Sequence, residues 1–354
     1  MMQISPETQL FIREHSSDDV RVLALQAKKY PDIDMPTAIT QIAGRKVAAE
    51  KIPSWWEIEK IWYPKHLSLE QCSSEITARY KARLLQGDSL TDLTGGFGID
   101  CSFLATGFKS ATYVERQEEL CEIAAHNFPV LNLNHINIKN EDGVTYLQAM
   151  SPVDCLFLDP ARRNEHGGKT VAISDCEPNV AELEELLLQK ANRVMIKLSP
   201  MLDLSLALKE LKQTQEVHIL SVNNECKELL ILLGQTSPTE ISIHCVNLST
   251  KGTQEEQHFV FTREQEQCSE CTYTDSLETY LYEPNASLLK AGAFRSIAAA
   301  YPVRKLHPNS HLYTSDTFIE NFPGRIFRIV NQCSFNKKEV KENLADLKKA
   351  NVTV

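Results

Sequence analysis

The sequence has 354 residues, of which 42% are hydrophobic and 24% are charged. It is therefore long enough for two or three domains with substantial cores, and too apolar to be a disordered chain. No apolar run approaches the roughly 18 residues that a membrane-spanning helix needs, and the polar start lacks the basic and apolar regions of a signal peptide. We expect a cytoplasmic protein.

The charge is unevenly distributed along the chain. The net charge of −10 argues against indiscriminate binding to a polyanion. Residues 286–354, however, contain 11 Lys and Arg against 5 Asp and Glu, a net charge of +6 that leaves −16 for the rest. We expect nucleic acid to dock on this basic end; the alternative is an ordinary solvated face.

The ten cysteines are scattered, and several lie in apolar runs, such as Cys155 and Cys245. This usage indicates reduced core thiols rather than a disulfide framework. Only Cys268 and Cys271 have the spacing of a metal site. Because a zinc site needs about four ligands and no second pair follows, we expect two loop thiols and no metal.

Residues 1–85 have apolar positions at helical spacing, interrupted by prolines, and no strand-like alternation. They predict a helical N-terminal domain. From Asp88 the pattern changes to alternating strands and helices over a domain of residues 86–236, which predicts a mainly parallel sheet covered on both faces. The expected strands are Ser89–Leu93, Ala111–Val114, Ile136–Ile138, Cys155–Leu158, Arg193–Leu198 and Val217–Val222, and the expected helices include Val180–Lys190 and Leu202–Gln213.

The stretch Leu90–Ile99 follows the first strand, where an apolar run stops at Asp92 and passes through three glycines. Glycines let backbone N–H groups approach a ligand at a helix N-terminus, which is how α/β sheets bind nucleotide-like molecules. The alternative is a purely structural turn. The dinucleotide fingerprint would use Gly96 and Gly98, but Cys101 stands where its third small residue belongs, which disfavours NAD.

Counted from Asp92, the turn has an Asp-x-Thr-x-Gly-x-Gly pattern, which resembles motif I of class I S-adenosylmethionine (SAM)-dependent methyltransferases. Thr94 replaces the commonest glycine there, as in variants found among nucleic-acid methyltransferases. The resemblance implies that the cofactor is SAM. It places the cofactor on the turn residues, which are Asp92, Thr94, Gly95, Gly96, Phe97 and Gly98.

Acidic residues follow the next two strands. Glu115 can accept both hydroxyls of a ribose, although NAD enzymes carry an acid there too. Asp142 resembles the residue that holds the adenine amino group; its alternative is a plain Asp-Gly turn. In methyltransferases the segment before the first strand often closes over the methionine end of SAM. This makes Ser74 and Lys81, with Glu75 and Tyr80, further candidates, unless the segment is only a connecting helix.

Asp159 and Pro160 end the fourth strand and resemble motif IV of amino methyltransferases. There the Asp side chain and a carbonyl fixed by the proline accept from a substrate N–H₂ and orient its lone pair. Ala161 and Arg162 depart from the motif, and an Arg162 guanidinium can stack on a base or bind phosphate. A proline turn with a capping Asp is the alternative. Since no cysteine nucleophile stands nearby, methylation of a pyrimidine C5 is disfavoured.

The sixth strand leads into Ser221–Gly234, expected to form the closing hairpin, with Asn224, Glu225 and Lys227 facing the substrate. After a break in the pattern at residues 235–238, two further strands are expected, at Ile241–Leu248 and Gln257–Thr262. They predict a small α+β, ferredoxin-like module over residues 237–280. A basic α/β domain over residues 281–354 follows, with a helix at Ala286–Ala300, a strand at Phe322–Val330 and a basic helix at Asn336–Ala350.

Most of the chain resembles a bacterial group of class I methyltransferases with a C-terminal THUMP-like domain. The markers are Glu70–Lys81, Asp92–Asp100, Asp159–Arg163 and Tyr282–Phe294. The resemblance implies a Rossmann-like α/β core with a mainly parallel seven-stranded sheet, a helical N-terminal domain and small α+β C-terminal modules. In that group the sequence continues further, so the chain is expected to end inside its last domain.

The resemblance also implies a function. THUMP domains belong to RNA-modifying enzymes, so we expect SAM-dependent methylation of a base of structured RNA, tRNA or rRNA, at a nitrogen. The catalytic residues would be Asp159, Pro160 and Arg162. The alternatives are a non-catalytic RNA-binding protein that retains the nucleoside pocket, and a methyltransferase that acts on a protein or a small molecule.

Overall fold

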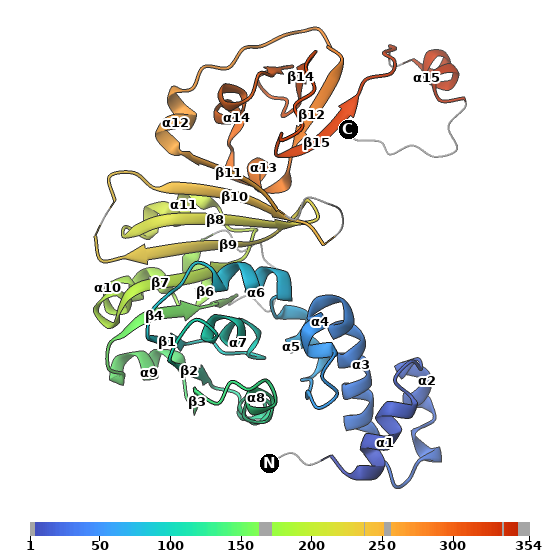
Figure 1. Ribbon diagram of the computed structural model, residues 1–354, viewed down its shortest axis with the longest axis vertical. Coiled ribbons are helices and arrows are strands. Elements are labelled where there is room, and N and C mark those ends of the chain that lie inside the picture. Colours follow the sequence, from blue (N-terminus) through green and yellow to red (C-terminus); the bar gives the residue numbers. More distant parts are fainter. Residues whose placement is uncertain (1–3, 163–171, 237, 251–255, 335, 346–354) are drawn as a thin grey trace.

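The computed structural model describes residues 4–162, 172–236, 238–250, 256–334 and 336–345. Its centre is a nine-stranded sheet with the order β11-β10-β8-β9-β7-β4-β1-β2-β3 (Figure 1). The strands are β1 (Ser89–Asp92), β2 (Ser110–Glu115), β3 (Ile136–Asn140), β4 (Val153–Leu158), β7 (Ala191–Leu198), β8 (Thr214–Val222), β9 (Glu225–Gly234), β10 (Ser242–Leu248) and β11 (Glu256–Thr262).

The sheet is mostly parallel. β9 pairs antiparallel with both β7 and β8, and β11 pairs antiparallel with β10, while the remaining pairings are parallel. The order from β3 to β8, with β9 inserted as a reversed strand, is that of the Rossmann-like methyltransferase core, which confirms the predicted fold class. Because parallel strands end at the same edge, β1, β2, β4 and β7 bring the residues that follow them together.

Helices cover both faces of the sheet, which explains the nearly continuous apolar strands. Along β9, Leu229 and Ile231 belong to one core cluster and Leu230 and Leu232 to the other. The first cluster includes residues of α9 (Gly143–Ala149), α10 (Val180–Lys190), α11 (Leu204–Glu210) and α13 (Ala286–Ala291). The second includes residues of α6 (Glu75–Ala82), α7 (Ile99–Ala105) and α8 (Glu118–Val130).

The N-terminal part is helical, as expected, and packs against the glycine turn. Trp55 meets Phe97 edge to face at 5.2 Å between ring centroids, and both are buried in one core cluster with Ile52 and Tyr63. The N-terminal helices thereby pack on the glycine turn. Its helices are α1 (Pro6–Glu14), α2 (Val20–Leu25), η1 (Ala27–Lys29), α3 (Met35–Lys51), α4 (Pro53–Trp56) and α5 (His66–Gln71).

The strands expected in a separate module over residues 237–280 instead extend the main sheet. β10 pairs in parallel with β8, and β11 pairs with β10, so the sheet has nine strands and not seven. Cys245 and Phe261 lie in the core cluster of the main sheet. A strand pattern shows that a segment is extended and buried, but not which sheet it joins, and this is why the boundary was misplaced.

The C-terminal part contains an antiparallel sheet with the order β13-β14-β12-β15. Its elements are α12 (Arg263–Cys268), β12 (Tyr280–Pro284), α14 (Phe294–Ala300), β13 (Arg304–Lys305), β14 (Tyr313–Ser315), β15 (Gly324–Arg328) and α15 (Lys337–Asn343). The helix expected at Ala286–Ala300 is broken at Gly292, which has φ +76°. Residues 346–350 of the expected basic helix lie outside the described residues.

The C-terminal part shares a core with the main sheet. Leu288 of α13 and Tyr282 of β12 are buried in the same cluster as the strands of the main sheet. The Ala286 backbone N–H donates to Asn224 Oδ1 at 2.7 Å, at the turn between β8 and β9. No helix among the described residues is long and apolar enough to cross a membrane.

Candidate active site

A large cavity lies at the carboxyl ends of β1, β2, β4 and β7, with a volume of about 1100 Å³. It brings together most of the residues singled out from the sequence. These are Asp92, Thr94, Gly95, Gly96, Phe97, Gly98, Glu115, Asp142, Asp159, Pro160 and Lys227. Because segments far apart in the sequence supply them, the sheet order is what assembles the site.

The glycine turn connects β1 to α7. Gly98 occupies the N-cap position of α7 with φ +88°, a conformation that favours glycine. Asp92 at the end of β1 is 1% exposed, and its Oδ1 accepts from the Thr94 N–H at 3.0 Å. Its other oxygen, Oδ2, is buried without a hydrogen-bond partner among the described residues. Burial raises the pKa of Asp92 well above its usual range.

Glu115 ends β2 and holds the turn through its carboxylate. Oε2 accepts from the Gly96 N–H at 2.9 Å, and Oε1 accepts from the Gln117 N–H at 2.8 Å. Each oxygen keeps a further lone pair for a ligand hydroxyl. Asp142, by contrast, caps α9, because its Oδ1 accepts from the backbone N–H groups of Val144 and Thr145.

The residues after β4 are tied to the glycine turn and to β7. The Asp159 N–H donates to Thr94 Oγ1 at 2.6 Å, which gives Thr94 a role that the commoner glycine could not fill. Lys197 on β7 donates to Asp159 Oδ2, with the lysine side chain 12% and the aspartate side chain 36% exposed. The sequence-based prediction had not identified Lys197. A charged residue inside the apolar run of β7 was the available signal, since it needs a partner there.

Asp100 on α7 lies behind this pair and links it to a second lysine. Lys197 Nζ is 3.7 Å from Asp100 Oδ2, and Lys81 Nζ is 2.9 Å from Asp100 Oδ1. Lys81, fully buried, also contacts Glu228 at 2.7 Å and donates to Ser73 Oγ at 2.9 Å. The two lysines and the acids therefore form one continuous charged network, which reaches the cavity wall at Asp100, Asp159 and Lys197.

The electrostatics of this network keep Lys197 protonated. Burial alone would lower the pKa of Lys197, but Asp159, Asp100 and Glu228 together raise it above its usual range. Burial raises the pKa of Asp159, against the opposing effect of Lys197. The pKa of Asp100 is lowered, because the two lysines outweigh the effect of its burial.

Several expected residues do not line the cavity. Ser74 and Lys81 are absent from its wall, which is formed there by Ser73. Glu75 accepts from the Ser54 N–H, and the Tyr80 hydroxyl contacts His218. These side chains support the fold instead.

Of four other candidates, three lie elsewhere in the structure or at the edge of what it describes. Arg162 lies on β5 (Ala161–Arg162), which pairs with β6 (Cys176–Glu177) after η2 (Ile173–Asp175), but its side chain lies outside what the structure describes. Asn224 contacts the C-terminal part, and Glu225 pairs with Lys227 at 2.7 Å. Of the three residues expected on the hairpin, Lys227 lines the cavity.

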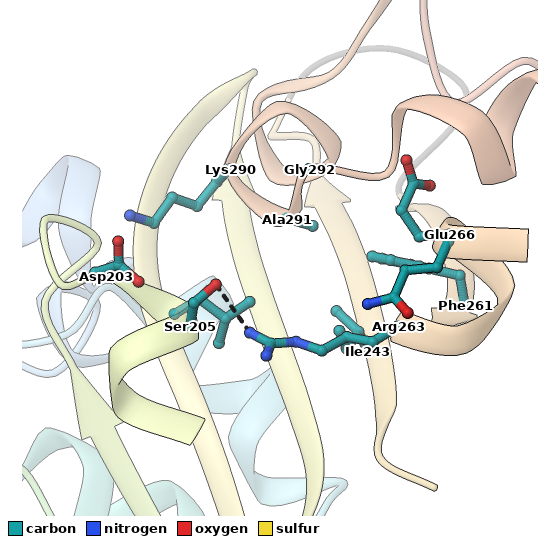
Figure 2. Close-up of a pocket in the computed structure, with 11 residues that line it drawn as sticks. Asp203, Ser205, Ile243, Phe261, Arg263, Glu266, Lys290, Ala291 and Gly292 are labelled. Atoms are coloured by element: carbon teal, nitrogen blue, oxygen red, sulfur yellow. Dashed lines mark hydrogen bonds between the residues drawn. The ribbon is translucent and has the colours of Figure 1, made fainter. Parts of the chain in front are cut away.

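A second cavity of about 430 Å³ lies between α11, α12 and α13 and shares no residue with the first (Figure 2). Its cationic side chains are already engaged. Arg263 donates to Ser205 Oγ at 3.0 Å, and Lys290 donates to the Leu202 carbonyl at 2.7 Å. We therefore place the candidate active site in the larger cavity.

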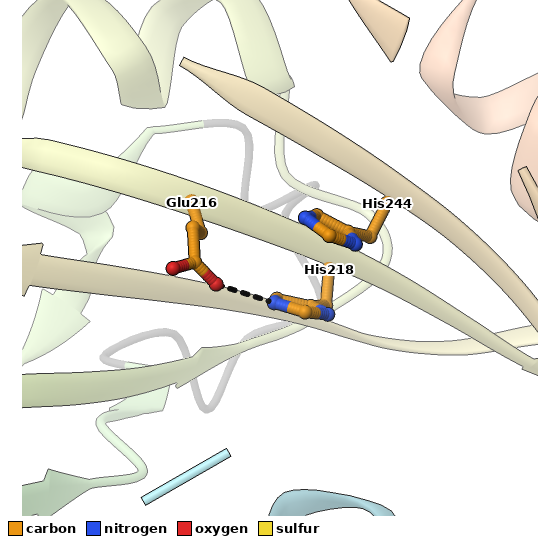
Figure 3. A group of neighbouring side chains, drawn as sticks. All are labelled: Glu216, His218 and His244. Atoms are coloured by element: carbon orange, nitrogen blue, oxygen red, sulfur yellow. Dashed lines mark hydrogen bonds and ion pairs between the residues drawn. The ribbon is translucent and has the colours of Figure 1, made fainter. Parts of the chain in front are cut away.

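Glu216, His218 and His244 offer the one group of metal-ligand atoms found in the described part of the chain, all within 4.8 Å (Figure 3). Their protein partners already satisfy them. The rings of His218 and His244 stack at 4.3 Å, His218 contacts the Tyr80 hydroxyl at 2.8 Å, and Arg193 pairs with Glu216. A hydrogen bond from His218 lowers the pKa of Glu216 to about 2, and burial lowers that of His244 to about 4. Stacked rings cannot direct both lone pairs to one ion without turning, so the group forms a polar network.

Comparisons with known proteins agree with this architecture. The chain matches the crystal structure of a "putative methyltransferase" from Porphyromonas gingivalis W83 with 34% identity and a TM-score of 0.86, over 99% of this chain and 88% of the other. A family model described as a ferredoxin-like domain matches residues 280–323. That is the C-terminal sheet, and not residues 237–280, where the sequence had suggested such a module. A search of curated proteins found no match.

Two weaker matches each cover 45% of the chain. An rRNA methylase from Streptococcus thermophilus has 14% identity and a TM-score of 0.32, over 45% of this chain and 93% of the other. A Streptococcus mutans protein in complex with S-adenosylhomocysteine (SAH) has 13% identity and a TM-score of 0.33, over 45% of this chain and 96% of the other. Both scores are too low to carry an argument about function.

Proposed function

Because the chain belongs to the same protein family as the Porphyromonas gingivalis protein, we propose that it is a SAM-dependent methyltransferase whose substrate is structured RNA. The observation that carries this proposal is the larger cavity, where the glycine turn, Glu115 and the Asp159–Lys197 pair converge at the carboxyl ends of the strands. Bound SAM would supply an activated methyl group there.

The residues present fit the cofactor. Asp92 Oδ2 is a buried acceptor without a partner among the described residues, and it suits the ammonium group of the methionine part. A Cβ placed on Gly96 would meet only the Thr94 carbonyl at 3.8 Å, so the backbone here is open to a ligand. Glu115 suits the ribose hydroxyls. Asp142 is proposed to accept from the adenine amino group through Oδ2, because Oδ1 caps α9.

Asp159 and Pro160 are proposed to align the acceptor. Pro160 fixes the chain after β4, and the hydrogen bond between the Asp159 N–H and Thr94 Oγ1 sets this segment against the cofactor turn. The nitrogen acceptor expected from the sequence would donate an N–H to the Asp159 carboxylate. In the structure that carboxylate also accepts from the Lys197 ammonium, at Oδ2.

The proposed RNA substrate rests on the basic C-terminal part. Its net charge of +6 over residues 286–354 suits phosphate contacts, and Lys337, Lys338 and Lys341 on α15 are exposed. The THUMP-like relation predicted from the sequence would serve the same role. Because α13 shares the core of the main sheet, this part is best tested in the full chain and not by deletion.

The experiment is methyl transfer to total cellular RNA. We expect the full chain to transfer tritium from methyl-labelled SAM to the RNA, in a reaction that SAH inhibits because it occupies the same cavity. The Asp32→Ala variant, which changes an exposed acid of the N-terminal domain, serves as a control and should label RNA at the wild-type rate. Tritium in protein instead of RNA would contradict the proposed RNA substrate but would leave the proposed methyltransferase activity in place.

A further inference from the structure

We propose that the acceptor atom of this site is a hydroxyl oxygen held between Asp159 and Lys197, which in RNA is the 2′-hydroxyl of a ribose. The inference rests on the proposed function and names its acceptor. It follows from the contact between the Lys197 ammonium and Asp159 Oδ2 at the wall of the cavity, and from the network that holds this ammonium in place.

The charge beside the acceptor distinguishes oxygen from nitrogen. An attacking amine gains positive charge as its lone pair forms the new bond, so a fixed ammonium beside it raises the barrier. A hydroxyl becomes a good nucleophile as it loses its proton, and the same ammonium stabilises the negative charge that this loss leaves on oxygen. Lys197 is such a fixed cation, because Asp159 and Asp100 both face it and it is largely buried.

Hydrogen bonding gives the same result. An amino group could donate an N–H to the Asp159 carboxylate, which accepts from Lys197 at Oδ2 alone, but it could not also accept from the ammonium, because its lone pair points at the methyl group. A hydroxyl can use both groups at once, since it donates its proton to the carboxylate and accepts from the ammonium. The pair is therefore complementary to a group that both donates and accepts a hydrogen bond. A hydroxyl is such a group. An amine whose lone pair points toward the methyl group is not.

The step balances with the groups present and the methyl donor. The hydroxyl oxygen forms the bond to the methyl carbon, the carbon–sulfur bond breaks with its electron pair left on sulfur, and the hydroxyl proton passes to the Asp159 carboxylate. The Asp159 carboxylate lies at the cavity wall, where it can accept this proton. Lys197 keeps its proton and stabilises the charge on oxygen.

The network behind the pair explains why Lys197 stays in position. Asp100 lies 3.7 Å from Lys197 and is itself fixed by Lys81 and by a hydrogen bond from Ser73 Oγ at 2.7 Å. Lys81 in turn contacts Glu228 on β9. Lys197 thus has two acidic neighbours, Asp100 and Asp159, and its ammonium is held at the cavity wall before any acceptor enters.

The first test identifies the methylated product. Total RNA labelled by the full chain with methyl-tritiated SAM is digested to nucleosides, and a second portion is hydrolysed with alkali. We expect the label in 2′-O-methylnucleosides and in alkali-stable dinucleotides, because a methylated 2′-oxygen cannot attack the neighbouring phosphate. Label in a base-methylated nucleoside would overturn this inference and leave the proposed function intact, whereas unlabelled RNA would overturn both.

The second test uses the sign of the effect at Lys197. In Lys197→Met we expect the rate of transfer to fall about 10²–10³-fold, as when one donor to a developing oxyanion is removed, with SAH affinity by calorimetry unchanged. Lys197→Arg should recover part of the rate. For a nitrogen acceptor, loss of the ammonium would free Asp159 and keep or raise the rate, which would overturn the inference.

A matched control separates charge from packing. Lys190 is a lysine outside the cavity, at the end of α10, where it donates to the Met150 carbonyl at 2.6 Å. The Lys190→Met variant should transfer methyl groups at the wild-type rate. If Lys197→Met does not bind SAH, Lys197→Arg and the product identity still decide between oxygen and nitrogen.

Discussion

In Asp159→Ala we expect turnover to fall by about 10²–10⁴-fold, the range for loss of a positioned acid–base group, while SAH still binds. Asp159 contacts Lys197 and lies at the cavity wall after β4, whereas the groups proposed to hold the cofactor lie on the glycine turn and at Glu115. The substitution leaves the backbone bond to Thr94 in place. The loss should therefore appear in kcat for methyl transfer to RNA and not in cofactor affinity.

Two further variants make this prediction specific. Asp159→Asn keeps the size of the side chain but cannot take up a proton, so we expect it to lose nearly as much turnover as Asp159→Ala. Asp32→Ala, in the N-terminal domain, should keep wild-type turnover. If Asp159→Ala retained near-normal activity on an RNA that the wild type methylates, Asp159 would be only a turn residue.

Lys81→Met should be the most destabilising single change in the network, at about 3–5 kcal/mol of unfolding free energy, the cost of removing one partner from a buried ion pair. Lys81 is 0% exposed, and its partners Asp100 and Glu228 have side chains that are 10% and 4% exposed. Without the lysine, two buried acids lose their closest cation. Urea unfolding followed by circular dichroism measures the effect.

The partner and surface variants test the cause. The double variant Lys81→Met/Glu228→Gln should recover part of the loss, since one of the two uncompensated charges is removed as well. Lys139→Met, at an exposed position of β3, should change the unfolding free energy by less than about 0.5 kcal/mol. A cost for Lys81→Met as small as that of Lys139→Met would show that the buried network contributes little to stability.

Much of the core could be predicted from the sequence, because local patterns determine it. Helix α10 has the predicted bounds, Val180–Lys190, and the residues that end β1, β2 and β4 meet at one cavity as expected from parallel strands.

The charged network could not be predicted, because its members meet only after the sheet has formed. Lys81 and Glu228 are 147 positions apart and are joined when β9 enters the sheet beside β7. Lys197 reaches Asp159 because β7 pairs with β4. The sequence pattern places each of these residues on its own element and does not show which elements meet. It also predicts a cofactor role for Lys81, whose side chain does not line the cavity. For the same reason the pattern assigns β10 and β11 to a separate module, whereas they pair with the main sheet.

Binding of SAH to the full chain, measured by calorimetry, tests the central claim most directly, because it requires neither the RNA nor the acceptor to be known. We expect one SAH to bind per chain and NAD not to bind, since Asp92, the glycine turn and Glu115 suit a methionine-bearing nucleoside. Failure of SAH to bind at about 1 mM, with NAD bound instead, would contradict it.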